Sequence, residues 1–340
     1  MKRLLILVMI TVFTLVGCQS NDSQAKSTTT KTQNDETSAL RKVTVVLDWT
    51  PNTNHTGLYV AKENGYFEQQ GLDVEIIQPG DAGADQLVAT GNAEFGVSYQ
   101  ESITFARTQD VPIVSIAAVI QHNTSGFASP AAKNITSPKD FENRVYGGWG
   151  SPIEQAVLKT LMNTENADIE KLDIVNAGDL DFFTMANKGI DFAWIYYAWT
   201  GIEAKLRGED INMVYLTDYS EKLDYYTPVL ATNETMINDD PNTVKAFVKA
   251  ASQGYQFAID NPEEAAAIFS NAVPELDAEL VLESQKWLSS KYQDDAPRFG
   301  EQKLEVWKNY ADWLKENGVL EGEFNPEDAF TNEFLPKEGE

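Results

Sequence analysis

The 340-residue chain carries 26 basic and 52 acidic side chains, a formal net charge of −26 at pH 7. This acidic excess excludes nucleic acid as a partner, because phosphate binding relies on lysine and arginine. One cysteine and two histidines rule out an intramolecular disulfide and leave little material for a thiolate or histidine site. We therefore expect no metal, no cofactor and no catalytic residue.

The first predicted element is a signal peptide at residues 1–17. Lys2 and Arg3 precede an unbroken apolar run at residues 4–16. A run of this length is too short to span a bilayer as a helix, but it is typical of a signal peptide.

The signal peptide ends in Leu15-Val16-Gly17-Cys18, which resembles the bacterial lipobox, a motif whose cysteine receives the lipid. Residues 19–39 are almost wholly polar, and such a composition forms a flexible tether. We therefore expect residues 18–40 to comprise the lipidated Cys18 and a disordered tether. This predicts a protein anchored by lipid to the extracytoplasmic face of the cell membrane.

After the tether, apolar strand-like runs alternate with segments of helical spacing, which indicates β-α-β units and an α/β fold with mainly parallel sheets flanked by helices. Gly65 follows the first predicted helix, where glycine often ends a helix. The predicted strands are residues 43–47, 72–77, 94–99, 111–120, 144–147, 172–175, 191–195 and 211–215. The predicted helices are residues 56–64, 81–90, 102–108, 152–163 and 180–188.

The α/β pattern stops at residues 123–133, which are rich in Ser, Ala and Asn, and then starts again. From Pro241 onward the pattern is almost continuously helical, and we expect this segment to pack on the first lobe. About 300 residues are more than one core usually holds, so we predict two lobes. Lobe 1 comprises residues 41–125 and 232–335, lobe 2 comprises residues 134–225, and the chain crosses between them at 123–133 and 226–231.

Polar and aromatic residues follow several predicted strands, and open α/β sheets bind ligands at the carboxyl ends of their strands. By this argument Asp48, Trp49, Asn52, Tyr99 and Glu101 are candidate ligand contacts from the first lobe. Asp48 could instead cap the following loop, and Asn52 could be a turn residue after a proline. His55 is expected to line the cleft or begin a helix.

The second lobe offers Trp149 and Ser151 after "YGGWG", where glycines allow close approach to a ligand. Ser151 and Glu154 also form a capping box, which is the default interpretation.

Farther along, Tyr196, Trp199 and Glu203 are spaced three and four residues apart, so a helix that begins after residue 195 would place them on one face. We expect Trp194, inside the strand, to belong to the core. Tyr225 and Tyr226 are expected at the hinge or rim.

Three stretches carry a family resemblance: "LDWTPNTNHTGLYVAKENGYFEQQGLDVEI", "GNAEFGVSYQES" and "DFAWIYYAWTGIEA". Over residues 43–330 the chain resembles the NMT1/THI5-like family, in particular its ThiY-like lipoproteins. The resemblance implies a two-lobed periplasmic-binding-protein fold (type 2, Venus-flytrap). It also implies a monomer that binds a formylated aminopyrimidine, a thiamin precursor, and delivers it to an ABC permease and ATPase complex.

The residue types agree with a flat amino-heterocycle, which needs aromatic faces and a few polar groups at its edge. We expect Trp49 to stack on the ring and Glu203 to accept from its amino group. Two alternatives remain. The same fold could bind a flavin precursor, a sulfonate or nitrate, although an anion site should gather arginines. The family's pyrimidine synthases use a cysteine-rich motif, whereas the one cysteine here is Cys18.

Overall fold

The computed structural model describes residues 39–178 and 180–337. The predicted signal peptide, Cys18 and nearly all of the predicted tether lie outside the described residues. Within the described ranges, no helix has both the length and the apolar character needed to cross a membrane.

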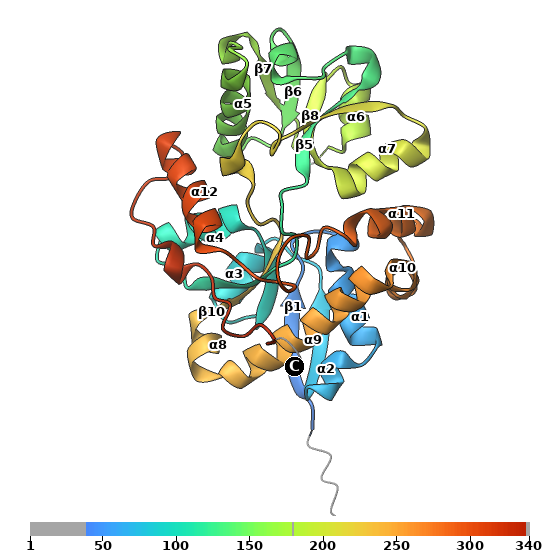
Figure 1. Cartoon of the computed structure of the whole chain (residues 1–340), viewed down its shortest axis with the longest axis vertical. Helices are drawn as coiled ribbons and strands as arrows, with labels where there is room; N and C mark the ends of the chain where they lie inside the picture. The colour runs from blue at the N-terminus through green and yellow to red at the C-terminus, as the bar shows by residue number, and fades with distance from the viewer. Residues whose placement is uncertain (1–38, 179, 338–340) are drawn as a thin grey trace, which may run out of the picture. The chain divides into compact units, whose positions relative to one another are not determined.

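The strands form two five-stranded sheets, and we call each sheet with the helices packed on it a lobe (Figure 1). The first sheet has the order β2-β1-β3-β10-β4, with β1 (Arg41–Val46), β2 (Leu72–Ile77), β3 (Phe95–Ser98), β4 (Ile113–Ala118) and β10 (Val229–Asn233). The second has the order β7-β6-β8-β5-β9, with β5 (Ser125–Pro130), β6 (Val145–Gly148), β7 (Asp173–Asn176), β8 (Phe192–Tyr196) and β9 (Ile211–Tyr215).

The two sheets share one topology. In each, the first three strands in the order pair in parallel, and the fourth is antiparallel to both of its neighbours. That antiparallel strand is the one the chain enters directly after leaving the other sheet, since β5 follows β4 and β10 follows β9. Each sheet is therefore mixed, and its one antiparallel inner strand is the first strand after a crossing between the sheets.

The predicted strands are all present, each within two residues of its expected ends, and those at residues 72–77 and 211–215 match their bounds. The prediction of a break at residues 123–133 is wrong, because β5 occupies Ser125–Pro130 and is buried between β8 and β9. A Cβ on Gly126 would lie 2.5 Å from the Val214 carbonyl oxygen, so this position needs glycine, a residue that is unusual in strands. The predicted crossing at 226–231 likewise overlaps β10.

The helices cover both sheets (Figure 1). Gly65, with φ of 70°, separates α1 from α2, as expected of a glycine after a helix end. The helices that precede β10 are α1 (Thr56–Glu63), α2 (Tyr66–Gln69), α3 (Gly83–Ala89), α4 (Gln100–Thr108), α5 (Pro152–Thr164), α6 (Phe182–Asn187) and α7 (Ile202–Arg207). The later ones are α8 (Glu234–Asp239), α9 (Pro241–Asp260), α10 (Pro262–Ala272), α11 (Ala278–Leu288) and α12 (Leu304–Glu316).

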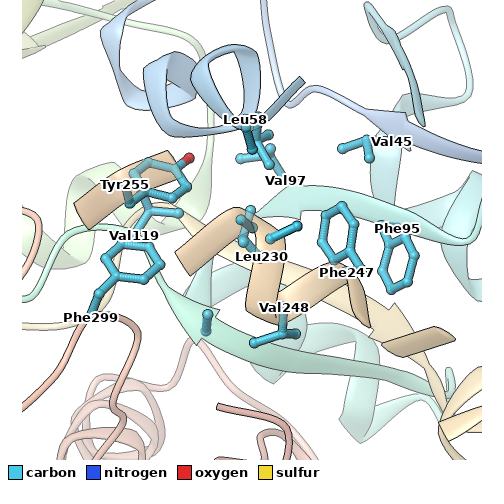
Figure 2. Packing of buried hydrophobic residues seen from close by; sticks show 14 of the residues in the cluster. Val45, Leu58, Phe95, Val97, Val119, Leu230, Phe247, Val248, Tyr255 and Phe299 are labelled. Atoms are coloured by element: carbon cyan, nitrogen blue, oxygen red, sulfur yellow. The ribbon is translucent and has the colours of Figure 1, made fainter. Parts of the chain in front are cut away.

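The core of the first lobe lies between its sheet and α9 (Figure 2). The Phe95 ring of β3 stacks on Phe247 of α9 with centroids 3.8 Å apart. Helix α9 also packs directly on α1, because Gly254 and Gly57 let the two backbones touch: a Cβ on Gly254 would lie 2.0 Å from the Gly57 carbonyl oxygen. The C-terminal segment thus begins by packing on the first lobe, as expected.

The core of the second lobe is built around the Phe127 ring of β5, which contacts Phe141, Tyr146 and Phe192 edge-on. Helix α12 joins this core, and its Trp313 indole N–H donates to Thr160 Oγ1 (3.1 Å). The start of α12 packs on the first lobe as expected, because Trp307 lies in a cluster with Val46 and Ile103. The expectation is wrong for the later part of α12, which packs on the second lobe. The lobe boundaries given above stay a prediction.

Candidate functional site

Asp48 lies just beyond the end of β1 and is the centre of a buried hydrogen-bond group. Its Oδ1 is 2.5 Å from Nε2 of His55, and its Oδ2 accepts from the Tyr99 hydroxyl (2.5 Å). The backbone N–H of Asn52 donates to Nδ1 of His55 (3.1 Å), so the ring hydrogen must be on Nε2 and points at Asp48. Burial raises the pKa of Asp48, but His55 and Tyr99 outweigh burial and lower the pKa below its ordinary value. Asp48 is thus held ionised and fixed in orientation.

Asn52 uses its side chain within the turn. Its carbonyl oxygen accepts from the backbone N–H of Asn54 (3.0 Å), and its amide donates to the Thr50 carbonyl (3.0 Å). The side chain caps the short 3-10 helix η1 (Thr53–His55) and is buried. The structure therefore favours the turn alternative for Asn52, and direct ligand contact stays a prediction.

A cavity of about 510 Å³ opens between residues of the two lobes. Its wall contains Glu101, whose Oε2 is buried and has no hydrogen-bond partner among the described residues. Burial, and secondarily the neighbouring Asp85, raise the pKa of Glu101 to about 8, although its own backbone N–H acts in the opposite direction. The first lobe contributes Asp85, Glu101, Ser102 and Phe105 to the wall; the others are Ser151, Pro152, Ile153 and Val319.

Ser151 begins α5 in the capping box that the sequence predicts. Its Oγ accepts from the Ile153 N–H (3.3 Å), and its own N–H donates to Oε1 of Glu154 (2.6 Å). The other oxygen of Glu154 accepts from the Trp149 N–H (3.0 Å) and from the Tyr146 hydroxyl (2.7 Å). Glu154 is 2% exposed, so this carboxylate fixes the loop that presents Trp149 and Ser151.

Trp49 and Trp149 are the two exposed tryptophans among the large apolar residues that the structure describes. They are 57% and 49% exposed, and each follows a strand with the same place in its sheet, β1 and β6. The Trp149 ring lies 5.4 Å from that of Trp194, at an interplanar angle of 50°. Large exposed aromatic faces are suited to stacking on a flat ligand.

The structure does not place Tyr196, Trp199 and Glu203 on one helical face, so that prediction is wrong. A π-helical turn, η5 (Tyr197–Gly201), follows β8 and changes the angular spacing before α7 begins. Tyr196 ends β8, with its hydroxyl 3.4 Å from Thr227 Oγ1.

The other two members of that predicted face point elsewhere. Trp199 packs on the cluster formed by α10 and α11, and Glu203 pairs with Arg207. Their roles as ligand contacts stay predictions and gain no support from this geometry.

Tyr225 and Tyr226 lie between β9 and β10, and each is 1% exposed. The rim alternative is therefore wrong, and the hinge alternative stays a prediction. Tyr225 packs on Tyr310 of α12 with ring centroids 4.3 Å apart. Tyr226 accepts from the Lys303 N–H (2.9 Å). Both rings extend the cores toward the crossing.

Sequence reasoning missed Asp85. It expected Trp194 in the core, and Trp194 does pack on Phe127 of the second-lobe core, but it also reaches Trp149. Asp85 lies in the first turn of α3, directly after β2, and the strand-end argument used for Asp48 would have found it. Trp194 is half-buried against Trp149, and its indole N–H is buried without a partner among the described residues. Tyr310 faces Glu101 from α12, and no local sequence signal indicates that approach.

The fold is that of the periplasmic binding proteins. The aliphatic sulphonate binding protein SsuA from Escherichia coli superposes with a TM-score of 0.68 at 10% sequence identity, over 88% of this chain and 95% of its own. The predicted fold class, two helix-flanked sheets of the type 2 periplasmic-binding kind, is thereby confirmed.

The chain belongs to the NMT1/THI5-like family, since residues 52–265 match the model of the family described as "NMT1/THI5 like". The formylaminopyrimidine-binding protein of Halalkalibacterium halodurans is 31% identical over 96% of this chain and 98% of its own length. The 4-amino-5-hydroxymethyl-2-methylpyrimidine phosphate synthase of Legionella pneumophila is 22% identical over 87% of this chain and 92% of its own length. The predicted family is confirmed.

Proposed function

We propose that this chain is the extracytoplasmic solute-binding lipoprotein of an ABC importer. In this proposal it binds a thiamin pyrimidine precursor, N-formyl-4-amino-5-aminomethyl-2-methylpyrimidine, between the lobes and delivers it to a permease and ATPase complex. Support comes from the near full-length similarity to a formylaminopyrimidine-binding protein. The protein acts as a monomer and is held on the outer face of the cell membrane by lipid on Cys18.

The observation that carries the proposal is a cavity lined by two carboxyl groups, Asp85 and Glu101, together with Phe105 and with Ser151 of the loop that presents Trp149. A neutral aminopyrimidine presents a flat ring together with amino donors and ring-nitrogen acceptors. Trp49 and Trp149 supply the faces, while Asp48, Tyr99, Glu101, Ser151 and Tyr196 supply polar groups. The cavity wall contains two carboxyl groups and no arginine or lysine, which disfavours a sulfonate or nitrate.

A binding role also suits the chain better than synthesis. The synthases of the family resemble this chain at lower identity than the binding protein does. The one cysteine of the sequence is Cys18, within the predicted lipobox, so the chain lacks material for a cysteine-rich motif. Tighter binding to a closed arrangement of the lobes than to an open one would present the loaded protein to the permease.

The decisive experiment is mass spectrometry of the small molecule that copurifies with the protein, followed by calorimetric titration. We expect the formylated aminopyrimidine to be recovered and to rebind with a one-to-one stoichiometry. Riboflavin, an aliphatic sulfonate and nitrate serve as competitors. Recovery or preferential binding of any of these three would overturn the pyrimidine assignment and retain the transport role.

A further inference from the structure

Two carboxyl groups line one wall of the cavity. Asp85 lies in the first turn of α3 and Glu101 in the first turn of α4, so both come from helices that directly follow strands of the first sheet. Oε2 of Glu101 is buried and meets no hydrogen-bond donor within residues 39–178 and 180–337. An ionised carboxylate accepts several hydrogen bonds when buried, and this oxygen has none.

The titratable groups that face Glu101 give it no compensating positive charge. They are Asp85 from α3, Tyr99 at the start of α4, Tyr196 from β8, Tyr225 from the segment before β10, and Tyr310 from α12. These five groups are one aspartate and four tyrosines, which are neutral when protonated and negative when deprotonated, so none of them can carry a positive charge. The backbone N–H of Glu101 favours its ionised form, but burial and Asp85 outweigh this and raise the pKa of Glu101.

The geometry points to Glu101 as a neutral acid that donates a hydrogen bond from its carboxyl O–H to the ligand. The site would therefore select a neutral acceptor, such as a ring nitrogen or a formyl oxygen, and would disfavour an anion, whose charge Asp85 would repel. This inference rests on the proposed function, because it assigns a specificity role within the same cavity. It reverses the usual expectation that a glutamate at such a site accepts from an amino group.

The inference has a definite pH dependence. With a pKa of about 8, Glu101 is protonated at neutral pH and loses its proton above pH 8. Above pH 8, Glu101 must take up a proton before it can donate to the ligand. The affinity for the ligand should therefore fall about tenfold per pH unit above pH 8. Asp48 stays ionised throughout this range, since its pKa is lowered.

The test is calorimetric titration with N-formyl-4-amino-5-aminomethyl-2-methylpyrimidine at pH 7, 8 and 9, for wild type and Glu101→Gln. Glutamine keeps a donor of similar shape and cannot titrate. We expect Glu101→Gln to bind within about threefold of wild type at pH 7, and to lose most of the fall in affinity at pH 9. Glu305→Gln is the matched control, because Glu305 is also in the first turn of a helix but is exposed.

A second measurement uses wild type alone and so does not depend on how the variant folds. Titrations at pH 9 in two buffers with different ionisation enthalpies should show the uptake of close to one proton per ligand. Circular dichroism of Glu101→Gln checks that the variant is folded.

The contrary outcomes are distinct. Equal wild-type affinity at pH 7 and 9 would overturn this inference and leave the proposed function standing. A loss of more than tenfold in Glu101→Gln at pH 7 would show that the carboxylate accepts. A fall at pH 9 that persists in the variant would place the titrating group elsewhere, for example at His122. If wild type failed to bind the pyrimidine at every pH, the proposed function would be wrong and the inference would fail with it.

Discussion

The two lobes share one topology, and each has a glutamate in the first turn of a helix that follows a strand, yet the two glutamates are used in opposite ways. Glu154 and Glu101 each lie in the first turn of a helix that follows a strand, α5 after β6 and α4 after β3. Glu154 accepts two backbone N–H groups and the Tyr146 hydroxyl, whereas Oε2 of Glu101 meets no donor in the part of the chain that the structure describes.

The difference shows that two lobes of the same topology can use a buried glutamate for different purposes, one to stabilise a loop and the other to face the cavity. In the second lobe the buried carboxylate fixes a glycine-rich loop, and that loop presents an aromatic face. In the first lobe the loop after β1 is fixed by Asp48, His55 and Tyr99, which leaves Glu101 free to face the cavity. Hydrogen-bond partners therefore indicate a residue's role better than its place in the fold does.

The largest expected effect is on stability, and it comes from removing Glu154 of the second lobe. Glu154→Ala removes a buried acceptor of three hydrogen bonds and leaves their donors unpaired, so the free energy of unfolding should fall by about 3 kcal/mol or more. Urea denaturation of the ligand-free protein measures this. Glu101→Ala, the matched change in the first lobe, should lower it by far less, and equal losses would refute the division of roles.

The next effect concerns the two exposed tryptophans. Trp49→Ala and Trp149→Ala should each weaken pyrimidine binding by about 1 to 3 kcal/mol, roughly fivefold to 150-fold, as for bases stacked on aromatic side chains. Thermal unfolding of the ligand-free Trp49→Ala protein should match wild type, because this ring is 57% exposed. Calorimetric titration measures the affinity of each variant for the pyrimidine. If either variant binds with normal affinity, its tryptophan does not contact the ligand.

Most of the fold could be predicted from sequence because its strands are short apolar runs bounded by turn residues. The strands at 72–77 and 211–215 show this pattern clearly. The exceptions, β5 and β10, are the strands that directly follow the two crossings between the lobes. Gly126 in β5 is there because Val214 leaves no space for a side chain, and such a constraint comes from a strand distant in sequence.

The candidate site was less predictable, because its chemistry depends on partners distant in the chain. Strand-end position correctly brought Asp48 and Tyr99 together, as their 2.5 Å hydrogen bond shows. Helical spacing failed for Glu203 because a π-helical turn intervenes, held in part by the Ser284 hydroxyl donating to the Ala198 carbonyl (2.5 Å). The roles proposed for the individual residues stay predictions until the variants are measured.

A smaller effect on stability follows from the raised pKa of Glu101. An acid whose folded-state pKa is about 8 and whose unfolded value is 4.5 destabilises the folded state increasingly as the pH rises from 4.5 to 8. Glu101→Gln should therefore raise the melting temperature at pH 8.5 by a few degrees and leave it nearly unchanged at pH 5. Scanning calorimetry at both pH values tests this, and a variant that melts lower at pH 8.5 would contradict it.

The smallest expected effect lies where the chain crosses between the lobes. His122, just after β4, pairs with Asp224, just before β10, through Nδ1 (2.6 Å), and its Nε2 lies 3.2 Å from Asp295. The hydrogen bond to Asp224 raises the pKa of His122 to about 9, against the effect of partial burial. The pair therefore stabilises the folded state fully below pH 6.5, and this contribution is lost as the pH rises through 9.

Because the His122 side chain is 42% exposed, solvent screens the pair, and its contribution should be no more than about 1 kcal/mol. His122→Gln should lower the melting temperature by one to a few degrees at pH 6 and have almost no effect at pH 10. This pH trend is opposite in sign to that of Glu101, so wild type, both single variants and the double variant can separate the two groups. If His122→Gln lowered the melting temperature equally at pH 6 and 10, His122 would stabilise the protein through packing and not through its ion pair with Asp224.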